Sequence, residues 1–306
     1  MADKRVYRIR DAPGAHPLEE FMPIELRLWW SALIAIAVLN LVTWCCLATA
    51  HRRERVLMPA ADWRARQLML LLAAGYTAGC AYRSVFPVFD IPRLALTDSL
   101  LASAFVGRMV ATAAELCFAA QWALSMRELV RATGERMAAW SAILILPLIG
   151  VAECASWHSV LTGVNLGHVI EESLWALCAC LVLLAFWSVR NWVRPDQRVS
   201  HAIAMVLCVG YVLYMFTVDV PQYYSRWMAD LQAGREFVGL VEGAMDAATR
   251  RTVSHGWNTW RDEAVWMSAY FSLGVWVSLG LAALIPFRGA AGQANAGYRA
   301  FRVSLM

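Results

Sequence analysis

Charged side chains are scarce in this sequence of 306 residues: only 16% are Asp, Glu, Lys or Arg, against about 25% in a typical soluble domain. Hydrophobic residues make up 60% of the chain, above the usual value of about 45–50%. Lys4 is the only lysine. The formal net charge of +4 is scattered over short segments rather than gathered on one face, which excludes a nucleic-acid-binding domain.

The motifs of several functional classes are also missing. The sequence has no Gly-rich phosphate loop and no Gly-x-Ser-x-Gly nucleophile elbow. It has no Cys-x-x-Cys pair, and its eight cysteines fall within apolar runs, where cysteine acts as a small apolar side chain. No apolar run contains lysine, which excludes a retinal Schiff base, and none of the six histidines lies in the middle of a run, which disfavours haem.

Long uncharged runs are what the sequence does contain. Residues 28–50 carry no charge, and about 20 apolar residues suffice to cross the hydrocarbon core of a bilayer. This run is too long for the apolar part of a signal peptide, and arginines follow it at once. We therefore predict an all-α integral membrane protein, a bundle of seven transmembrane helices. The expected spans are 28–50, 67–86, 104–126, 140–158, 168–190, 201–220 and 264–287.

The remaining segments are predicted to be two tails and one long loop. Residues 1–27 and 288–306 form the polar tails on either side of the transmembrane domain 28–287. The outer loop 221–263 joins the sixth and seventh spans. Within it, apolar residues from Leu231 to Met245 recur at helical spacing, which predicts a helix lying on the membrane surface.

The distribution of arginine predicts the orientation. The loops 51–66, 127–139 and 191–200 are rich in arginine, whereas the segment 158–167 has neither arginine nor lysine. Because short cytoplasmic loops carry the excess of positive charge, we expect the C-terminus in the cytoplasm and the N-terminus outside. The basic residues of the N-terminal tail oppose this assignment. We expect a multi-pass protein of a bacterial inner membrane.

Ionisable residues inside the spans are the strongest functional signal, because they are costly in a bilayer and usually face the interior of a bundle. Arg108, Thr112 and Glu115 share one face of the third helix, since seven residues make almost two turns. His168 and Glu171 share a face of the fifth helix. Under the predicted topology these residues lie in the outer half of the bundle, together with Glu153, Asp219 and Arg83.

Each of these residues also has a purely structural interpretation. Arg108 and Glu115 are expected to form an internal ion pair, because a buried charge persists only when it is paired. Arg83 could fasten the outer turn through Asp90 or Asp98. Glu171 and Glu172 could be solvated acids that interact with a helix dipole, and His158 and His168 could face water. Glu153 is the hardest to explain in this way, because apolar residues precede it for more than two turns.

The leading functional hypothesis is a membrane-embedded enzyme that acts on a lipid or another apolar substrate. Glu115, Glu153 and Asp219 are its predicted catalytic groups. Arg83 and Arg108 are expected to orient an anionic group of the substrate. Metal assistance by zinc, iron or manganese would use His168, Glu171 and Glu153 as ligands, because carboxylates and imidazole suit these ions.

The alternative hypothesis is a non-enzymatic membrane protein. It could be a sensor, a carrier of cations or protons, or an integral subunit of a membrane complex. The expected partners are membrane lipid and either a second copy of the chain or another subunit of such a complex.

Overall fold

The computed structural model describes residues 22–55, 60–193 and 195–284, which contain ten α-helices, three short strands and a few short 3-10 or π-helical turns. The predicted tails lie almost wholly outside these residues, as does the end of the seventh predicted span. The helices are α1 (Ile24–Glu54), α2 (Ala60–Val85), α3 (Ala104–Thr133), α4 (Arg136–Thr162), α5 (Leu166–Val189), α6 (Arg198–Tyr214), α7 (Val220–Gln232), α8 (Leu240–Thr249), α9 (Trp257–Ala269) and α10 (Val275–Leu284).

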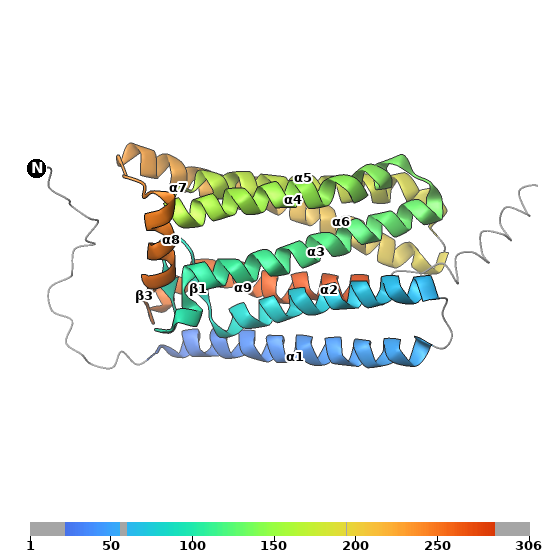
Figure 1. The fold of residues 1–306 in the computed structure, drawn as a ribbon, viewed down its shortest axis with the longest axis horizontal. Coiled ribbons are helices and arrows are strands. Elements are labelled where there is room, and N and C mark those ends of the chain that lie inside the picture. Colours follow the sequence, from blue (N-terminus) through green and yellow to red (C-terminus); the bar gives the residue numbers. More distant parts are fainter. Residues whose placement is uncertain (1–21, 56–59, 194, 285–306) are drawn as a thin grey trace, which may run out of the picture.

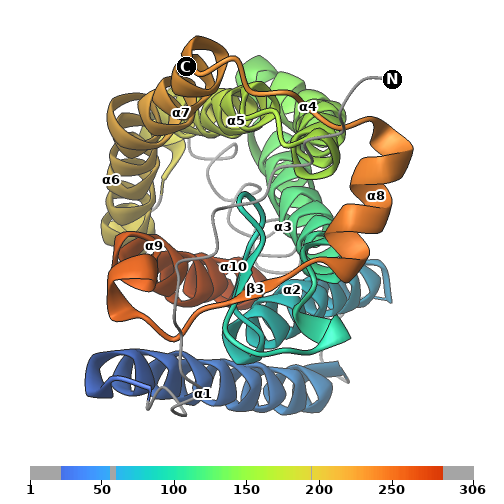
Figure 2. The same cartoon turned by 90° about the vertical axis from the view of Figure 1, so that its left-hand side faces the viewer.

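Within the described residues, seven helical segments are long and apolar enough to cross a membrane. They run side by side as a bundle (Figure 1), which is the architecture of a multi-pass membrane protein. Two of the seven are interrupted by π-helical turns, Met215–Asp219 between α6 and α7, and Tyr270–Gly274 between α9 and α10. The end-on view shows α3, α5, α6 and α9 around the middle of the bundle, with α1 on its outside (Figure 2).

The sixth span is longer than the sequence predicts. The helix does not end at residue 220 but continues through the π-helical turn and α7 to Gln232. Pro221 caused the error, because proline usually ends a helix. It comes just after the π-helical turn and lies in the first turn of α7, so the chain stays helical past a residue that has no N–H to donate. The seventh span likewise begins earlier, at Trp257. The predicted outer loop 221–263 is therefore reduced to residues 233–256.

This shorter loop covers one end of the bundle. It contains α8, which crosses that end nearly perpendicular to the spans (Figure 1). A helix is therefore present in the loop, over Leu240–Thr249 only. Gly243 allows α8 to lie against the end of α4, because a Cβ atom there would come within 1.7 Å of the Leu161 carbonyl oxygen. Arg93 anchors α8 by donating to Asp246 at 2.9 Å.

A small sheet completes this end of the molecule. Strands β1 (Val88–Phe89) and β2 (Leu94–Ala95) are antiparallel, and β3 (Thr252–Val253) joins β2 in parallel. The sheet ties the α2–α3 connection to the segment that leads into α9.

Two apolar cores hold the spans together. One packs α1, α2, α9 and α10 around Tyr76, Phe271 and Met267. The other packs α3, α4 and α5 around Met126, Ile145 and Val182. The polar groups described next lie on α3, α4 and α5, nearer the end that α8 covers.

Candidate functional site

The third helix contributes the central cation of the site. Arg108, Thr112 and Glu115 face the same side of α3, as their spacing predicts. Arg108 Nε donates to the Thr112 hydroxyl at 3.4 Å, and its Nη2 atom donates to Glu115 at 2.7 Å. The expected ion pair between Arg108 and Glu115 is therefore present.

The guanidinium of Arg108 is shared by three carboxylates from three helices. Besides Glu115 of α3, it contacts Glu153 of α4 at 2.6 Å and Glu171 of α5 at 3.1 Å. Oxygen atoms of the three glutamates lie within 4.8 Å of one another. Arg108 and the three glutamates are each 7% exposed or less. We call these four side chains the carboxylate cluster.

Glu115 and Glu153 bind the same end of the Arg108 guanidinium. Their Oε2 atoms accept hydrogen bonds from the same nitrogen, Nη2 of Arg108. The second oxygen of Glu153, Oε1, is buried and has no hydrogen-bond partner among the described residues. Glu171 is better compensated, because it contacts Nη1 of Arg108 and also His168 Nδ1, at 2.8 Å.

The approach of α5 to α4 depends on Gly167. A Cβ atom at this position would meet the Ala155 carbonyl oxygen at 2.2 Å and the Ser159 hydroxyl at 2.5 Å. The next residue, His168, donates its backbone N–H to the same hydroxyl at 3.0 Å. The missing side chain of Gly167 thus lets the first turns of α5 place Glu171 beside Glu153, with His168 against Glu171.

Neighbouring side chains link the carboxylate cluster to a fourth span. Tyr270, the first residue of the π-helical turn after α9, donates to Glu115 Oε1 at 2.8 Å. On the other side, Thr112 donates to Glu153 at 2.6 Å and accepts from the indole N–H of Trp157 at 3.0 Å. Helices α3, α4, α5 and α9 are therefore joined through one buried polar network.

The charges of the carboxylate cluster do not balance. If all three glutamates are ionised, one guanidinium leaves two negative charges uncompensated, and a protonated His168 would compensate only one. Uncompensated charge is strongly disfavoured in a low-dielectric interior. The arrangement therefore requires either bound protons or an additional cation.

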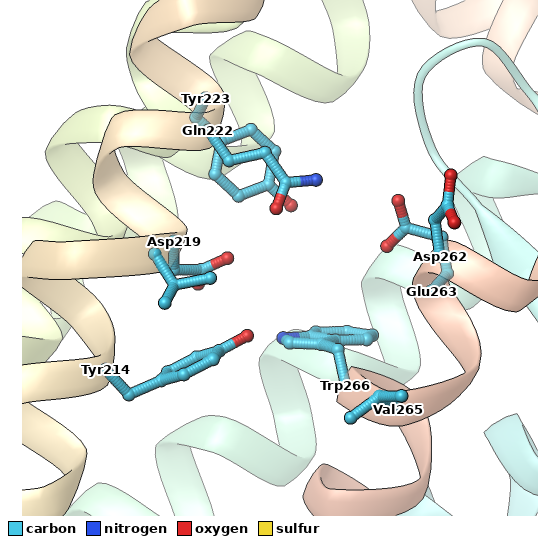
Figure 3. A pocket seen from close by; sticks show the side chains of 9 residues that line it. Tyr214, Asp219, Gln222, Tyr223, Asp262, Glu263, Val265 and Trp266 are labelled. Atoms are coloured by element: carbon cyan, nitrogen blue, oxygen red, sulfur yellow. The ribbon is translucent and has the colours of Figure 1, made fainter.

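Asp219 belongs to a neighbouring cavity and not to the carboxylate cluster. The cavity has a volume of about 160 Å³ and lies between the α6–α7 segment and α9. Figure 3 shows Asp219, Tyr214 and Tyr223 on one side of it, facing Glu263 and Trp266 on the other. The ring of Tyr223 also packs against the His168 imidazole, with 4.9 Å between ring centroids. Tyr223 thus stands between the cavity and the carboxylate cluster.

Arg83 is placed elsewhere. Its Nη2 atom donates to the Val88 carbonyl oxygen at 3.2 Å, so it fastens the turn after α2 through backbone rather than through Asp90 or Asp98. Asp98 instead pairs with Arg251 at 2.9 Å.

A second buried polar pair was not identified as functional from the sequence. Gln121 of α3 accepts a hydrogen bond from Ser278 of α10 at 2.5 Å, and both side chains are fully buried. The sequence signal that could have revealed this pair is a glutamine in the middle of an apolar run. Because the pair is uncharged and joins two spans, we assign it a structural role.

Comparison with known protein families, curated proteins and solved structures finds no match to this chain. Function is therefore inferred from the site itself.

Proposed function

We propose that this chain is a proton-responsive membrane protein whose carboxylate cluster holds a proton shared between Glu115 and Glu153. The observation that carries the proposal is the sharing of one guanidinium by three buried carboxylates. Two acids held this close by a single donor nitrogen resist double ionisation, and a shared proton relieves the repulsion.

The surroundings of the carboxylate cluster support proton entry from the cavity side. His168 contacts Glu171 through Nδ1 and packs against Tyr223, which lines the cavity. The two ring nitrogens of an imidazole can donate one hydrogen bond and accept another, so the ring can pass on a proton. Further along the bundle, α3, α4 and α5 pack against one another mainly through apolar side chains such as Ile145, Met126 and Val182, while the buried Gln121 of α3 pairs with Ser278 of α10. The apolar packing favours binding of a proton from the cavity side over passage of protons through the whole bundle.

A change in protonation would alter the packing of the spans. Gain or loss of the shared proton changes the charge on oxygens that accept hydrogen bonds from Arg108, Thr112 and Tyr270. These donors lie on two different spans. Sensing or proton-coupled carriage fits this arrangement better than substrate orientation by Arg108, because the guanidinium is already occupied by three glutamates.

Trp157 provides a local reporter for the proposal, because its indole N–H reaches Glu153 through the Thr112 hydroxyl. Tryptophan fluorescence of the purified protein is recorded as a function of pH. We expect a pH-dependent component that disappears in Trp157→Phe and also in Glu153→Gln. The matched control, Glu242→Gln on the exposed face of α8, should retain it. A component that persists unchanged in Glu153→Gln would refute proton binding at this pair.

A metal-assisted enzyme acting on a lipid is the second candidate. It is favoured by the unpartnered Oε1 atom of Glu153 and by the three glutamate oxygens within 4.8 Å. An ion bound there would displace Arg108 and be held by Glu115, Glu153 and Glu171, with Asp219 at the cavity as an acid or base. Of the ligands expected from the sequence, His168 lies outside this group and contacts Glu171 instead. Metal analysis of the purified protein separates the candidates. Stoichiometric zinc, iron or manganese that is lost in Glu153→Gln would support the enzyme, whereas a metal-free protein supports proton binding.

A further inference from the structure

The cavity between the sixth and seventh spans has an acidic residue without a partner. Of its three carboxylates, Glu263 is paired with Arg226 at 3.0 Å and Asp262 with Arg261 at 3.3 Å. Asp219 is 95% buried, its side chain points into the cavity (Figure 3), and it receives no hydrogen bond from any residue that the structure describes. A buried carboxylate facing an open space needs a cation or a donor from outside the chain.

Aromatic side chains line the same space. Tyr214 and Tyr223 lie on the side of Asp219, and Trp266 lies opposite. One face of the Trp266 ring stacks on Tyr270, with 5.5 Å between centroids and 13° between planes. Aromatic rings combined with a carboxylate are the surroundings that proteins use to bind organic ammonium groups.

The size of the cavity fits one small group. Its volume is about 160 Å³, and an apolar cavity of about 150 Å³ is known to accept benzene, a molecule of six heavy atoms. A trimethylammonium group with its attached methylene has five. The cavity can therefore hold a headgroup end, but not a large ligand.

The rim of the cavity is amphipathic. Val265 is 77% exposed and Val218 46% exposed, and each lies on a helical segment that is apolar enough to cross a membrane. The Asp262 side chain, on the same rim, is 74% exposed and polar. An amphiphile with a cationic headgroup matches both parts of such a rim, because its chain can lie along the valines while its headgroup enters.

We propose that this cavity binds an organic ammonium group through the Asp219 carboxylate and the Trp266 ring. The group is either the headgroup of a membrane lipid or a free ammonium compound. This proposal does not depend on proton binding in the carboxylate cluster. Trp266 contacts Tyr270, which donates to Glu115, so an occupied cavity would also touch the network that joins the spans.

Lipid binding tests the first source of the ammonium group. Purified protein is mixed with phosphatidylcholine, phosphatidylethanolamine or phosphatidylglycerol of identical acyl chains, and retained lipid is measured by native mass spectrometry. We expect retention of at least one ammonium lipid over phosphatidylglycerol. Asp219→Asn should weaken it on the order of tenfold, because a contact between charged groups is lost. The control Glu242→Gln, which changes an exposed carboxylate on α8 outside the cavity lining, should bind as the wild type does.

Soluble probes test whether the ligand is a free ammonium compound, and this test uses the wild-type protein alone. Choline is compared by equilibrium dialysis with 3,3-dimethylbutan-1-ol, its uncharged isostere. Binding of choline over the isostere, without a preference among lipids, would identify a free ammonium compound as the ligand. A preference for ammonium lipids would identify the headgroup. If the wild-type protein distinguishes neither choline from its isostere nor ammonium lipids from phosphatidylglycerol, the proposal is wrong.

Discussion

Replacement of Arg108 by methionine should destabilise the protein more than the loss of any one carboxylate around it. Methionine keeps much of the length of the side chain but removes the guanidinium. Three buried glutamates then lose their shared cation, together with contacts of 2.7, 2.6 and 3.1 Å. Removing one partner of a buried ion pair typically costs about 3–5 kcal/mol, and we expect Arg108→Met to reach at least this range.

Glu153→Gln should behave differently. The amide keeps the shape of the side chain and can still accept a hydrogen bond from Arg108, while one of the excess negative charges is removed. We therefore expect a cost within about 1 kcal/mol, the net value of a typical hydrogen bond. The double variant Arg108→Met/Glu153→Gln should recover part of the loss caused by Arg108→Met, because the two residues are in contact.

Thermal unfolding in detergent at neutral pH measures these differences. Arg250→Gln is the matched arginine control, since Arg250 is 54% exposed in its pair with Asp246 and such pairs contribute about 0–1 kcal/mol. If Glu153→Gln lowers the free energy of unfolding as much as Arg108→Met does, or more, the carboxylate cluster does not carry an excess of negative charge. Strict additivity in the double variant would show that the two residues do not interact.

Three further predictions concern other parts of the molecule. Gly167→Ala should lower the free energy of unfolding by at least about 1–3 kcal/mol through overpacking and should displace His168. The control Gly150→Ala on α4, where a Cβ meets no atom within 4 Å, should leave it unchanged. Thermal unfolding of both variants measures the difference. Partial burial raises the pKa of Asp246, but hydrogen bonds from Arg250 and Arg93 outweigh it and hold the pKa below its ordinary value of 3.8. The stabilisation of α8 by ionised Asp246 is present above pH 3.8 and is lost as the pH falls through the lowered pKa. Hydrogen exchange of α8 should therefore accelerate only in acid. Asp246→Asn should accelerate it at neutral pH. Single cysteines at Arg55 and Gly234, in a background without the native cysteines, should show labelling of position 234 alone by an impermeant reagent in intact cells; the reverse pattern would invert the proposed orientation.

The sequence predicts the spans and the faces of single helices well. Apolar length identifies all seven spans, and the periodicity of 3.6 residues groups Arg108, Thr112 and Glu115, and also His168 with Glu171. Both signals are local, because they depend only on residues within one helix.

Contacts between helices could not be predicted in the same way. The 3.6-residue periodicity predicts which face of α4 carries Glu153. It does not predict that this face meets Arg108, because the rotation of each helix about its axis is set by close packing at residues such as Gly167. Asp219 and Arg83 were expected in the same site because they lie toward the same end of the bundle. The π-helical turn before α7 instead directs Asp219 into the cavity, and the carbonyl oxygen of Val88 holds Arg83.

The protonation of the carboxylate cluster can be observed directly by infrared spectroscopy. A protonated carboxyl group has a carbonyl stretching band that is distinct from the bands of a carboxylate. We predict this band in the wild-type protein at neutral pH, with its loss or shift in Glu115→Gln and in Glu153→Gln and no change in Glu242→Gln. Absence of the band, or a band that neither variant alters, would contradict a proton shared between Glu115 and Glu153.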